Sequence, residues 1–481
     1  MNINVLLKTT GTVLFWESVL MIPSLIIAIY DNSYDINGFL ISIIIAGLIG
    51  LMLRNIKSDI NDMRKREGYA TVAICWLVMS LIGALPFYIS RAIPSYVDAL
   101  FETISGFTTT GSSIVRDIES MPRALLFWRS FTHWIGGMGV LVFTLALIPS
   151  IGGRTVFLMR AESSGPTPGK LVPKLSESSK ILYIIYAVMT AIFIVLLIIA
   201  GMPVFDSFIH GFGTAGTGGF SNKALSVGYY NNPYIDWIIT IGMFVFGINF
   251  TLIYLFIKKD FKTVFKNEEL RLYSFYVLIG ILLVFINVLP KFQFDYSEAL
   301  RHSAFTISSL VSTTGYATTD FNLWPMFSKA VLLTLMLFGS CAGSTAGGIK
   351  SVRVLVLFKS MIYEIRRTIH PSSVQTIKID NKSINDDTLK SILIFFFSYI
   401  LIIIIAVILV SLDNFDFMTT FSSVLAMVSN IGPGFSLVGP MGNFADFSSF
   451  SKIVLSACMI LGRLEVIPVL ILLSPANWKR H

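Results

Sequence analysis

Charged residues are scarce in this sequence. Aspartate, glutamate, lysine and arginine make up only 13% of the 481 residues, whereas hydrophobic residues make up 54%. In soluble domains about a quarter of the residues are charged. The composition therefore indicates a chain embedded in a lipid bilayer.

Cysteine is almost absent as well. The three cysteines, Cys75, Cys341 and Cys458, each lie in an apolar run without Cys-x-x-Cys spacing, so the sequence implies neither a disulfide framework nor a metal-thiolate site. The five histidines show no metal-ligand spacing, and no carboxylate pair or nucleophile–base pair stands out. We therefore expect a protein that is not an enzyme and has no covalently bound cofactor.

The excess of positive charge does not indicate a nucleic-acid partner. The net charge is +8, but the basic residues gather in connections between apolar segments, at 54–66, 154–174, 258–271 and 366–382. The alternate connections hold mostly acidic and neutral residues. Because positively charged loops stay in the cytoplasm, we expect a multi-pass protein in contact with the lipid bilayer, with both termini cytoplasmic.

Ten apolar stretches approach the roughly 20 residues needed to cross a bilayer. They cover approximately 11–30, 38–53, 70–90, 124–149, 180–201, 235–257, 272–290, 326–358, 389–411 and 451–473. Four outer connections also contain a shorter apolar segment followed by glycine, starting at Asp98, Asp206, Glu298 and Asp416. A segment of about a dozen residues is too short to span the bilayer, but it can enter and return as a re-entrant helix. The third of these helices is expected to begin near Ser297 or Glu298.

The pattern predicts an all-α polytopic membrane protein. It has about ten transmembrane helices plus four re-entrant pore helices around a fourfold pseudo-symmetric pore. The predicted divisions are 1–68 for two leading helices, 69–152 for repeat 1, 153–262 for repeat 2, 263–386 for repeat 3 with an intramembrane gating loop, and 387–481 for repeat 4.

Each short segment ends in a small polar triplet. The triplets are Thr109-Thr110-Gly111, Thr217-Gly218-Gly219, Thr313-Thr314-Gly315 and Asn430-Ile431-Gly432. Irregular backbone survives at membrane depth only where it lines water or protein, and rings of carbonyl oxygens form ion-selectivity filters. Without a ring of carboxylates, such oxygens suit a monovalent alkali cation better than calcium or magnesium. The alternative is that these are ordinary glycine turns in outer loops.

Several motifs together resemble the Trk/Ktr/HKT superfamily of potassium and sodium transporters, and within it the bacterial TrkH-type membrane subunit. They are "FTTTG" (107–111), "GTGGFS" (216–221), "AGSTAGGIKS" (342–351), "HPSSV" (370–374), "SNIGPG" (429–434) and "GRLE" (462–465). The resemblance covers essentially the whole chain.

The resemblance implies potassium uptake across the bacterial cytoplasmic (inner) membrane, with K+ as the only metal ion, held at the four triplets. It also implies a homodimer in which each protomer has its own pore. A cytosolic regulatory subunit of the TrkA/RCK type would bind the nucleotide (ATP, ADP or NAD), so that nucleotide acts only through this partner. Two alternatives stay open, namely a symporter coupled to H+ or Na+ and a sodium-permeable relative. The triplets lack the Thr-Val-Gly-Tyr-Gly sequence of tetrameric potassium channels, so discrimination between potassium and sodium is expected to be modest.

Two elements are predicted to form a gate. The stretch 326–358 is too long for one straight crossing, and its glycine- and serine-rich centre should unwind or kink. The predicted gating residues there are Gly343, Ser344, Thr345, Ala346, Gly347, Gly348 and Lys350. The alternative is a close-packing patch between helices.

Arg463 is the second gating element. It is predicted to lie in the middle of the last span, where a charge is costly and faces a cavity or a partner. Glu465, two residues further on, lies on another helix face. We expect Arg463 to oppose cation passage until it is displaced; the alternative is a buried ion pair with an acid on another helix.

Overall fold

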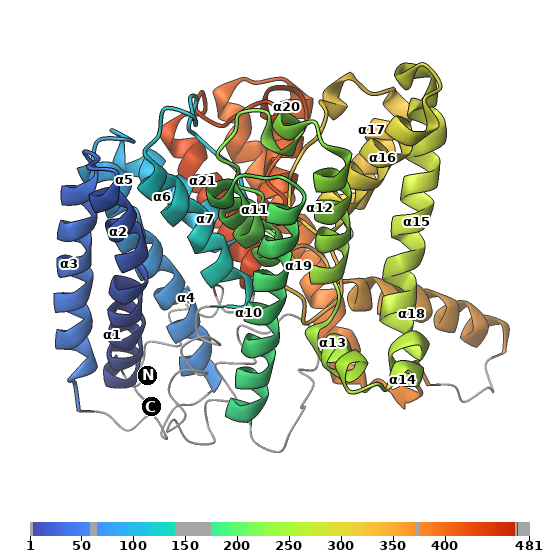
Figure 1. The fold of residues 1–481 in the computed structure, drawn as a ribbon. Helices are drawn as coiled ribbons and strands as arrows, with labels where there is room; N and C mark the ends of the chain where they lie inside the picture. The colour runs from blue at the N-terminus through green and yellow to red at the C-terminus, as the bar shows by residue number, and fades with distance from the viewer. Residues whose placement is uncertain (1–2, 58–64, 140–174, 371–375, 467–468, 470–481) are drawn as a thin grey trace.

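The structure is a computed structural model that describes residues 3–57, 65–139, 175–370, 376–466 and 469. It is built almost entirely of helices, with one two-stranded hairpin, β1 (Lys378–Ile379) and β2 (Lys382–Ser383). Figure 1 shows the long helices running side by side, with shorter helices between them toward the upper end. The chain is a multi-pass membrane protein with several long apolar helices.

The leading part of the chain is an antiparallel helical hairpin. It consists of α1 (Ile3–Leu20), α2 (Ile22–Tyr30) and α3 (Ile36–Arg54). An added Cβ at Gly11 or Gly50 would lie within 3.0 Å of backbone atoms of the facing helix. Glycine is therefore required at these two positions, because close helix approach in a membrane depends on small residues.

Four helical groups follow in chain order. The first has α4 (Lys65–Gly83), α5 (Leu85–Ile89), α6 (Tyr96–Phe107) and α7 (Arg123–Gly137); the second has α10 (Leu175–Ile199), α11 (Val204–Gly216), α12 (Pro233–Phe246), α13 (Phe250–Ile257) and α14 (Phe261–Lys266). The third has α15 (Glu268–Val288), α16 (Tyr296–Val311), α17 (Met326–Leu335) and α18 (Ser351–Ile369); the fourth has α19 (Asp386–Val410), α20 (Phe417–Val428) and α21 (Ser449–Arg463). Each group contains one helix of 12 to 16 residues that ends directly before one of the predicted triplets, and these four short helices are α6, α11, α16 and α20.

The ten apolar stretches do not all form straight spans. Among the described residues, six helical segments are long and apolar enough to cross a membrane. They are Ile3–Tyr30, Ile36–Arg54, Glu67–Ile89, Ser179–Ile199, Glu268–Phe292 and Asp386–Asp413.

The remaining stretches are interrupted or shorter than predicted. The span predicted at 235–257 is a helix pair bent by 101°, and the span at 326–358 is divided into α17 and α18, as its glycine-rich centre predicted. In the stretch 124–149, α7 ends at Gly137, and residues from 140 onward lie outside the described part of the chain. In the stretch 451–473, α21 ends at Arg463, and residues 467–468 and 470–473 lie outside the described part of the chain.

The four short helices lie inside the protein, whereas several long helices surround them. In α6 every residue from Phe101 to Phe107 is buried. By contrast, in the most apolar stretch of each of α10, α15 and α19 only 28% of the residues are buried. Exposed side chains such as Leu278 and Phe397 leave these helices with apolar surfaces suited to lipid.

Local sequence marks where three of the four short helices begin. The side chains of Ser95, Asp295 and Asp416 accept hydrogen bonds from the first-turn amides of α6, α16 and α20, as expected of N-cap residues. The third helix begins at Tyr296, which confirms the predicted start within two residues.

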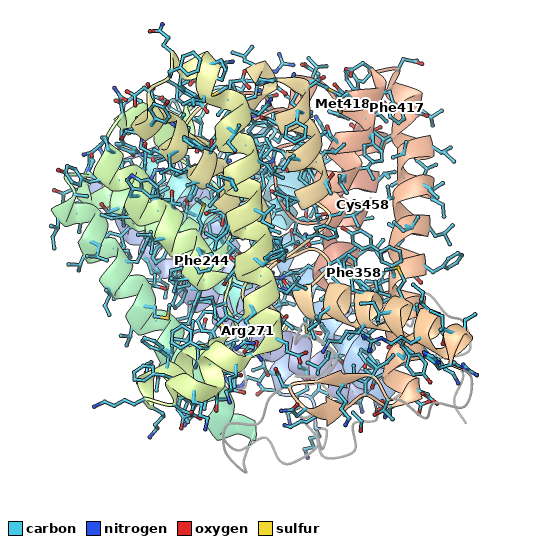
Figure 2. All side chains as sticks on the ribbon, turned by 90° about the vertical axis from the view of Figure 1, so that its right-hand side faces the viewer. Phe244, Arg271, Phe358, Phe417, Met418 and Cys458 are labelled. Carbon is cyan, nitrogen blue, oxygen red and sulfur yellow. The ribbon has the colours of Figure 1, made fainter. Side chains whose placement is uncertain are left out.

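The two ends of the bundle differ in the residues they carry. Figure 2 places Phe417 and Met418, at the start of α20, at the upper end, and Arg271 in the lower half beside α18. In Figure 1, α18 runs across the direction of α15 near the lower end. The basic connection that includes α14 therefore lies at the end opposite to the starts of the short helices.

Candidate functional site

The four predicted triplets share one backbone conformation. The first residue of each has a left-handed φ, namely 55° at Thr109, 56° at Thr217, 58° at Thr313 and 53° at Asn430. The glycines follow two residues later with φ of 82°, 80°, 81° and 102°. Non-glycine residues adopt positive φ only where the surroundings hold them there, so this fourfold repetition indicates a shared role.

Each short helix ends with the same hydrogen bond. The amide before the glycine donates to the carbonyl five residues earlier, for Thr110 to Ser105 at 2.9 Å, Gly218 to Gly213 at 2.7 Å, Thr314 to Ser309 at 2.9 Å and Ile431 to Ala426 at 2.9 Å. This bond is typical of a Schellman helix end. The helix end therefore fixes the direction in which each triplet leaves the helix.

The four triplets form a closed ring. An added Cβ would lie within 3.0 Å of a carbonyl oxygen of the next triplet at every glycine. Gly111 would meet Gly218 O, Gly219 would meet Thr314 O, Gly315 would meet Ile431 O, and Gly432 would meet Thr110 O. The fourth contact returns to the first triplet, so the segments surround one common axis and are not independent surface turns.

One cavity of about 150 Å³ lies against this ring, and all four glycines line it. Its charged lining residues are Arg116, Arg129 and Lys223. Each of these pairs with an acid, Asp446 at 2.5 Å, Glu102 at 2.5 Å and Glu119 at 3.6 Å respectively. Because the positive charges are paired, their repulsion of an entering cation is reduced.

Buried hydroxyl groups surround the same axis. Thr108 and Thr110 share a hydrogen bond of 2.8 Å, and the corresponding Ser312 and Thr314 share one of 2.7 Å. Asn430 Nδ2 donates to Thr110 Oγ1 at 3.0 Å, which joins the fourth triplet to the first. The triplets contain no carboxylate, so the oxygens that they offer are neutral, which is the pattern expected of a monovalent cation site.

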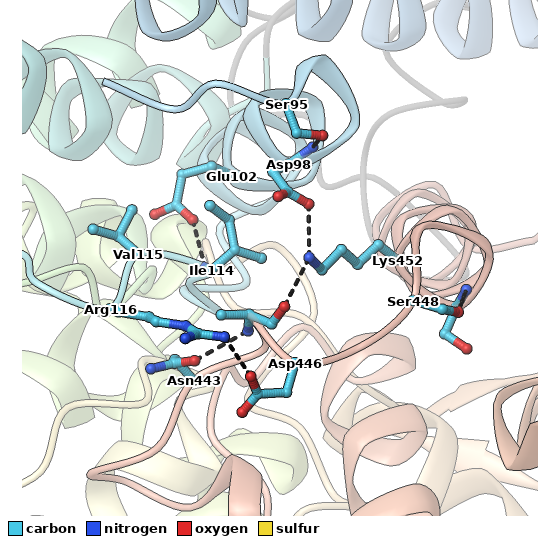
Figure 3. A network of polar contacts seen from close by, with 12 residues as sticks. Ser95, Asp98, Glu102, Ile114, Val115, Arg116, Asn443, Asp446, Ser448 and Lys452 are labelled. Atoms are coloured by element: carbon cyan, nitrogen blue, oxygen red, sulfur yellow. Dashed lines mark hydrogen bonds and ion pairs between the residues drawn. The ribbon is translucent and has the colours of Figure 1, made fainter. Parts of the chain in front are cut away.

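The first and fourth repeats are also joined by two ion pairs (Figure 3). Lys452 Nζ contacts Asp98 Oδ1 at 2.7 Å and Ala445 O at 3.0 Å. Arg116 pairs with Asp446 nearby. The Lys452 side chain is 6% exposed, whereas the Arg116 side chain is 70% exposed. We therefore expect the Lys452 pair to contribute more to stability.

Replacing Lys452 with methionine should lower the free energy of unfolding by about 2 kcal/mol, because it leaves the partly buried Asp98 unpaired. Equilibrium unfolding in mixed detergent micelles measures the change. Arg116→Met is the matched control and should cost less than about 1 kcal/mol, since that pair is exposed. Equal losses for the two variants would contradict this assignment.

Sequence reasoning missed the residues that support the ring from behind. Glu102 on α6 accepts hydrogen bonds from Ser113 Oγ at 3.0 Å and the Ile114 amide at 2.9 Å, and pairs with Arg129 on α7. Arg129 also donates to Ser221 O at 3.0 Å, which lies beyond the second triplet. This buried pair therefore links the first two repeats. An ionisable residue within an apolar segment was the signal that could have identified both.

The predicted gating loop lies directly against the ring. The Gly347 amide donates to Thr313 Oγ1 at 2.8 Å. An added Cβ at Gly347 would also lie within 3.0 Å of Asn430 Cβ and Ser429 O. The loop tip thus contacts the left-handed residues of the third and fourth triplets.

The other predicted gating residues belong to the same loop. Gly343 and Gly348 have φ of 72° and 69°. Ser344 Oγ donates to Cys341 O at 2.6 Å, and Thr345 Oγ1 donates to Phe246 O at 3.4 Å. Lys350 is buried and its Nζ donates to Ala346 O. The Lys350 ammonium is therefore engaged within the loop itself.

Arg463 holds this loop to another helix. It is the last residue of α21, and most of the predicted span beyond residue 466 lies outside the described residues. Its guanidinium donates to Thr345 O at 2.7 Å, Gly136 O at 2.5 Å and Gly137 O at 2.8 Å. Glu465 pairs with Arg353. Arg463 thus connects the loop tip to the end of α7 through backbone carbonyls.

Comparison with known proteins places this geometry among transporters. Residues 35–480 match the TrkH family of cation transport proteins. The Trk system potassium uptake protein TrkG of Escherichia coli K12 is 34% identical over 483 residues, covering 99% of both chains. The corresponding TrkH of that strain is 34% identical over 478 residues and 97% of both chains. The crystal structure of the potassium transporter TrkH from Vibrio parahaemolyticus is similar over the full length of both chains, with a TM-score of 0.89 and 30% identity.

Proposed function

Because this chain belongs to the TrkH family of cation transport proteins, we propose that it carries out potassium uptake across the bacterial cytoplasmic membrane. The observation that carries the proposal is the closed ring, in which every glycine packs against a carbonyl of the next triplet. Such a ring can replace the water shell of a dehydrated cation with main-chain oxygens. Potassium is the transported substrate, and the chain is a transporter and not an enzyme.

The proposed filter consists of the four triplets that end in Gly111, Gly219, Gly315 and Gly432. Positive φ at these glycines allows the preceding carbonyls to be directed to the common axis. The short helices also end at this axis, so their partially negative C-terminal ends favour a cation there. These two effects support cation binding without any carboxylate.

The proposed gate is the loop from Gly343 to Lys350 together with Arg463. The support is its position, since the loop tip contacts Thr313 and Asn430 of the ring. A tip that occupies this place obstructs the path, and withdrawing it would open the path. Regulation by a cytosolic nucleotide-binding subunit of the TrkA/RCK type, and assembly as a homodimer, belong to the same proposal. The Trk-system names of the relatives support association with further components.

Ion flux in proteoliposomes tests the function. Purified protein in potassium-loaded vesicles should take up 86Rb+ when only a potassium gradient is present, and excess external K+ should compete more strongly than Na+. Vesicles without protein give the background. Uptake that requires a proton or sodium gradient would instead identify a coupled symporter, and equal competition by Na+ would identify a sodium-permeable relative.

A further inference from the structure

One side of α15 holds both ends of the loop. Glu269 Oε1 accepts hydrogen bonds from the Ala342 amide at 2.6 Å and from the Val352 amide at 3.1 Å. Glu269 is only 6% exposed. The Glu269 carboxylate therefore joins Ala342, on one side of the loop tip, to Val352 in the first turn of α18, on the other side.

Tyr276 makes a second attachment two turns further along the same helix. Its hydroxyl contacts Gly339 O at 2.5 Å and Ser351 Oγ at 2.6 Å. Residues seven apart lie on one helix face, so Glu269 and Tyr276 act together on the loop base. The base is closed by two backbone bonds, from Gly339 N to Ile349 O at 2.7 Å and from Ser351 N to Ser340 O at 3.0 Å.

The carboxylate of Glu269 also stabilises the start of α18. The N-cap residue of α18 is Lys350, whose side chain forms no capping hydrogen bond within the described chain. The first amides of a helix lack partners within the helix and carry partial positive charge. Glu269 supplies the missing acceptor from another helix, so its position determines where α18 and the loop end are anchored.

The position of Glu269 depends in turn on the hairpin formed by β1 and β2. Asp380, at the hairpin turn, accepts hydrogen bonds from Asn267 Nδ2 at 2.7 Å and from the Glu268 amide at 2.9 Å. Lys359 on α18 pairs with Glu268 and donates to Lys378 O at 2.7 Å. The hairpin is thus bound to the first residues of α15, directly beside Glu269.

We propose that Glu269 is a positioning residue of the gating loop and that the Lys378–Ser383 hairpin sets its place through Asp380. This inference rests on the proposed function of the loop as the gate. In this arrangement the segment between Gly343 and Gly348 is the part that moves, while Glu269 and Tyr276 hold the base of the loop. A displacement of the hairpin then changes conduction without changing the filter.

A double-mutant cycle tests the link. In 86Rb+ flux into proteoliposomes, Glu269→Ala should raise the flux about fivefold, because it releases both loop ends and favours withdrawal of the tip. Asp380→Ala should raise it about twofold. If Asp380 acts through Glu269, the double variant should not exceed Glu269→Ala, since interacting sites are not additive. Tyr276→Phe, a milder change, should raise flux less than Glu269→Ala.

Two further measurements separate positioning from general damage. The ratio of potassium to sodium flux should stay at the wild-type value in all these variants, whereas a distorted filter would change it. Hydrogen exchange of peptides covering 338–353 should be faster in Glu269→Ala and Asp380→Ala. Asp387→Ala, which removes an exposed acid of α19, is the matched control and should alter neither measurement.

The outcomes are distinct. Multiplicative effects in the double variant, an altered ion ratio, or unchanged flux in folded Glu269→Ala would overturn the inference. Wild-type protein that conducts no Rb+ would instead refute the proposed function. In that case faster exchange in Asp380→Ala would still support the physical link from the hairpin to the loop, and unchanged exchange would refute it.

Discussion

Gly315→Ser should lower the ratio of potassium to sodium flux by roughly tenfold. Gly315 has a φ of 81°, and an added Cβ would lie within 3.0 Å of Ile431 O and 2.7 Å from Pro433 Cδ. The side chain therefore displaces one carbonyl of the ring. Strain of about 1–3 kcal/mol at such a position is comparable to the energy that separates two similar cations. Competition between K+ and Na+ for 86Rb+ uptake measures the ratio.

Gly201 provides the matched control for this substitution. It also has a positive φ, 94°, but an added Cβ would find nothing within 4 Å. Gly201→Ser thus introduces backbone strain without a contact in the ring, and the ion ratio should be unaffected. An unchanged ratio in correctly folded Gly315→Ser protein, or an equal change in Gly201→Ser, would exclude the filter assignment. Gly315→Asp adds a charge at the same place and should abolish measurable potassium flux.

Arg463→Ala should raise 86Rb+ flux by roughly 10- to 100-fold at a fixed gradient. The arginine donates three hydrogen bonds to carbonyls of Thr345, Gly136 and Gly137, and bonds from a charged donor contribute about 1.5–3 kcal/mol each. Their loss releases the loop tip from α7 and shifts the gate toward its withdrawn state. The potassium-to-sodium ratio should not change, because the ring keeps its own contacts.

Two other arginine variants test whether the lost guanidinium bonds cause the increase in flux. Arg463→Lys keeps the charge but has a compact ammonium that cannot reproduce the planar guanidinium geometry, so its flux should lie between those of wild type and alanine. Arg367→Ala removes an exposed arginine, 62% exposed and paired with Glu364, and should leave the flux unchanged. If flux in folded Arg463→Ala is equal to or below that of wild type, Arg463 does not restrain the gate.

The ring was the most predictable part of the protein. The four triplets stand out because hydroxyl residues and glycine interrupt apolar sequence at membrane depth, where irregular backbone requires a partner. The break between α17 and α18 was predictable for a related reason, since Gly343, Gly347 and Gly348 lie close together in the middle of one apolar stretch. In both cases the signal is local, so a single sequence carries it.

Other features depend on contacts between distant residues. Hydropathy predicts a straight span at 235–257, but the bend between α12 and α13 places Asn249 as an N-cap, and the Phe250 amide donates to Gly343 O at 3.0 Å. Arg463 was expected to act through its charge, whereas its hydrogen bonds within the described part of the chain go to carbonyls on two other segments. Glu269 looks like an ordinary first-turn acid of α15. Only the fold reveals that its carboxylate faces Ala342 and Val352.

The contact between the first and last triplets has a consequence for synthesis. Ser112 Oγ donates to Gly432 O at 2.9 Å across 320 residues of sequence, and contacts this far apart form late during chain production. A nascent chain therefore inserts its first three repeats into the membrane before the fourth repeat has been synthesised. No complete conduit is then present in the membrane until translation is nearly finished, so partially made chains lack the assembled ion path.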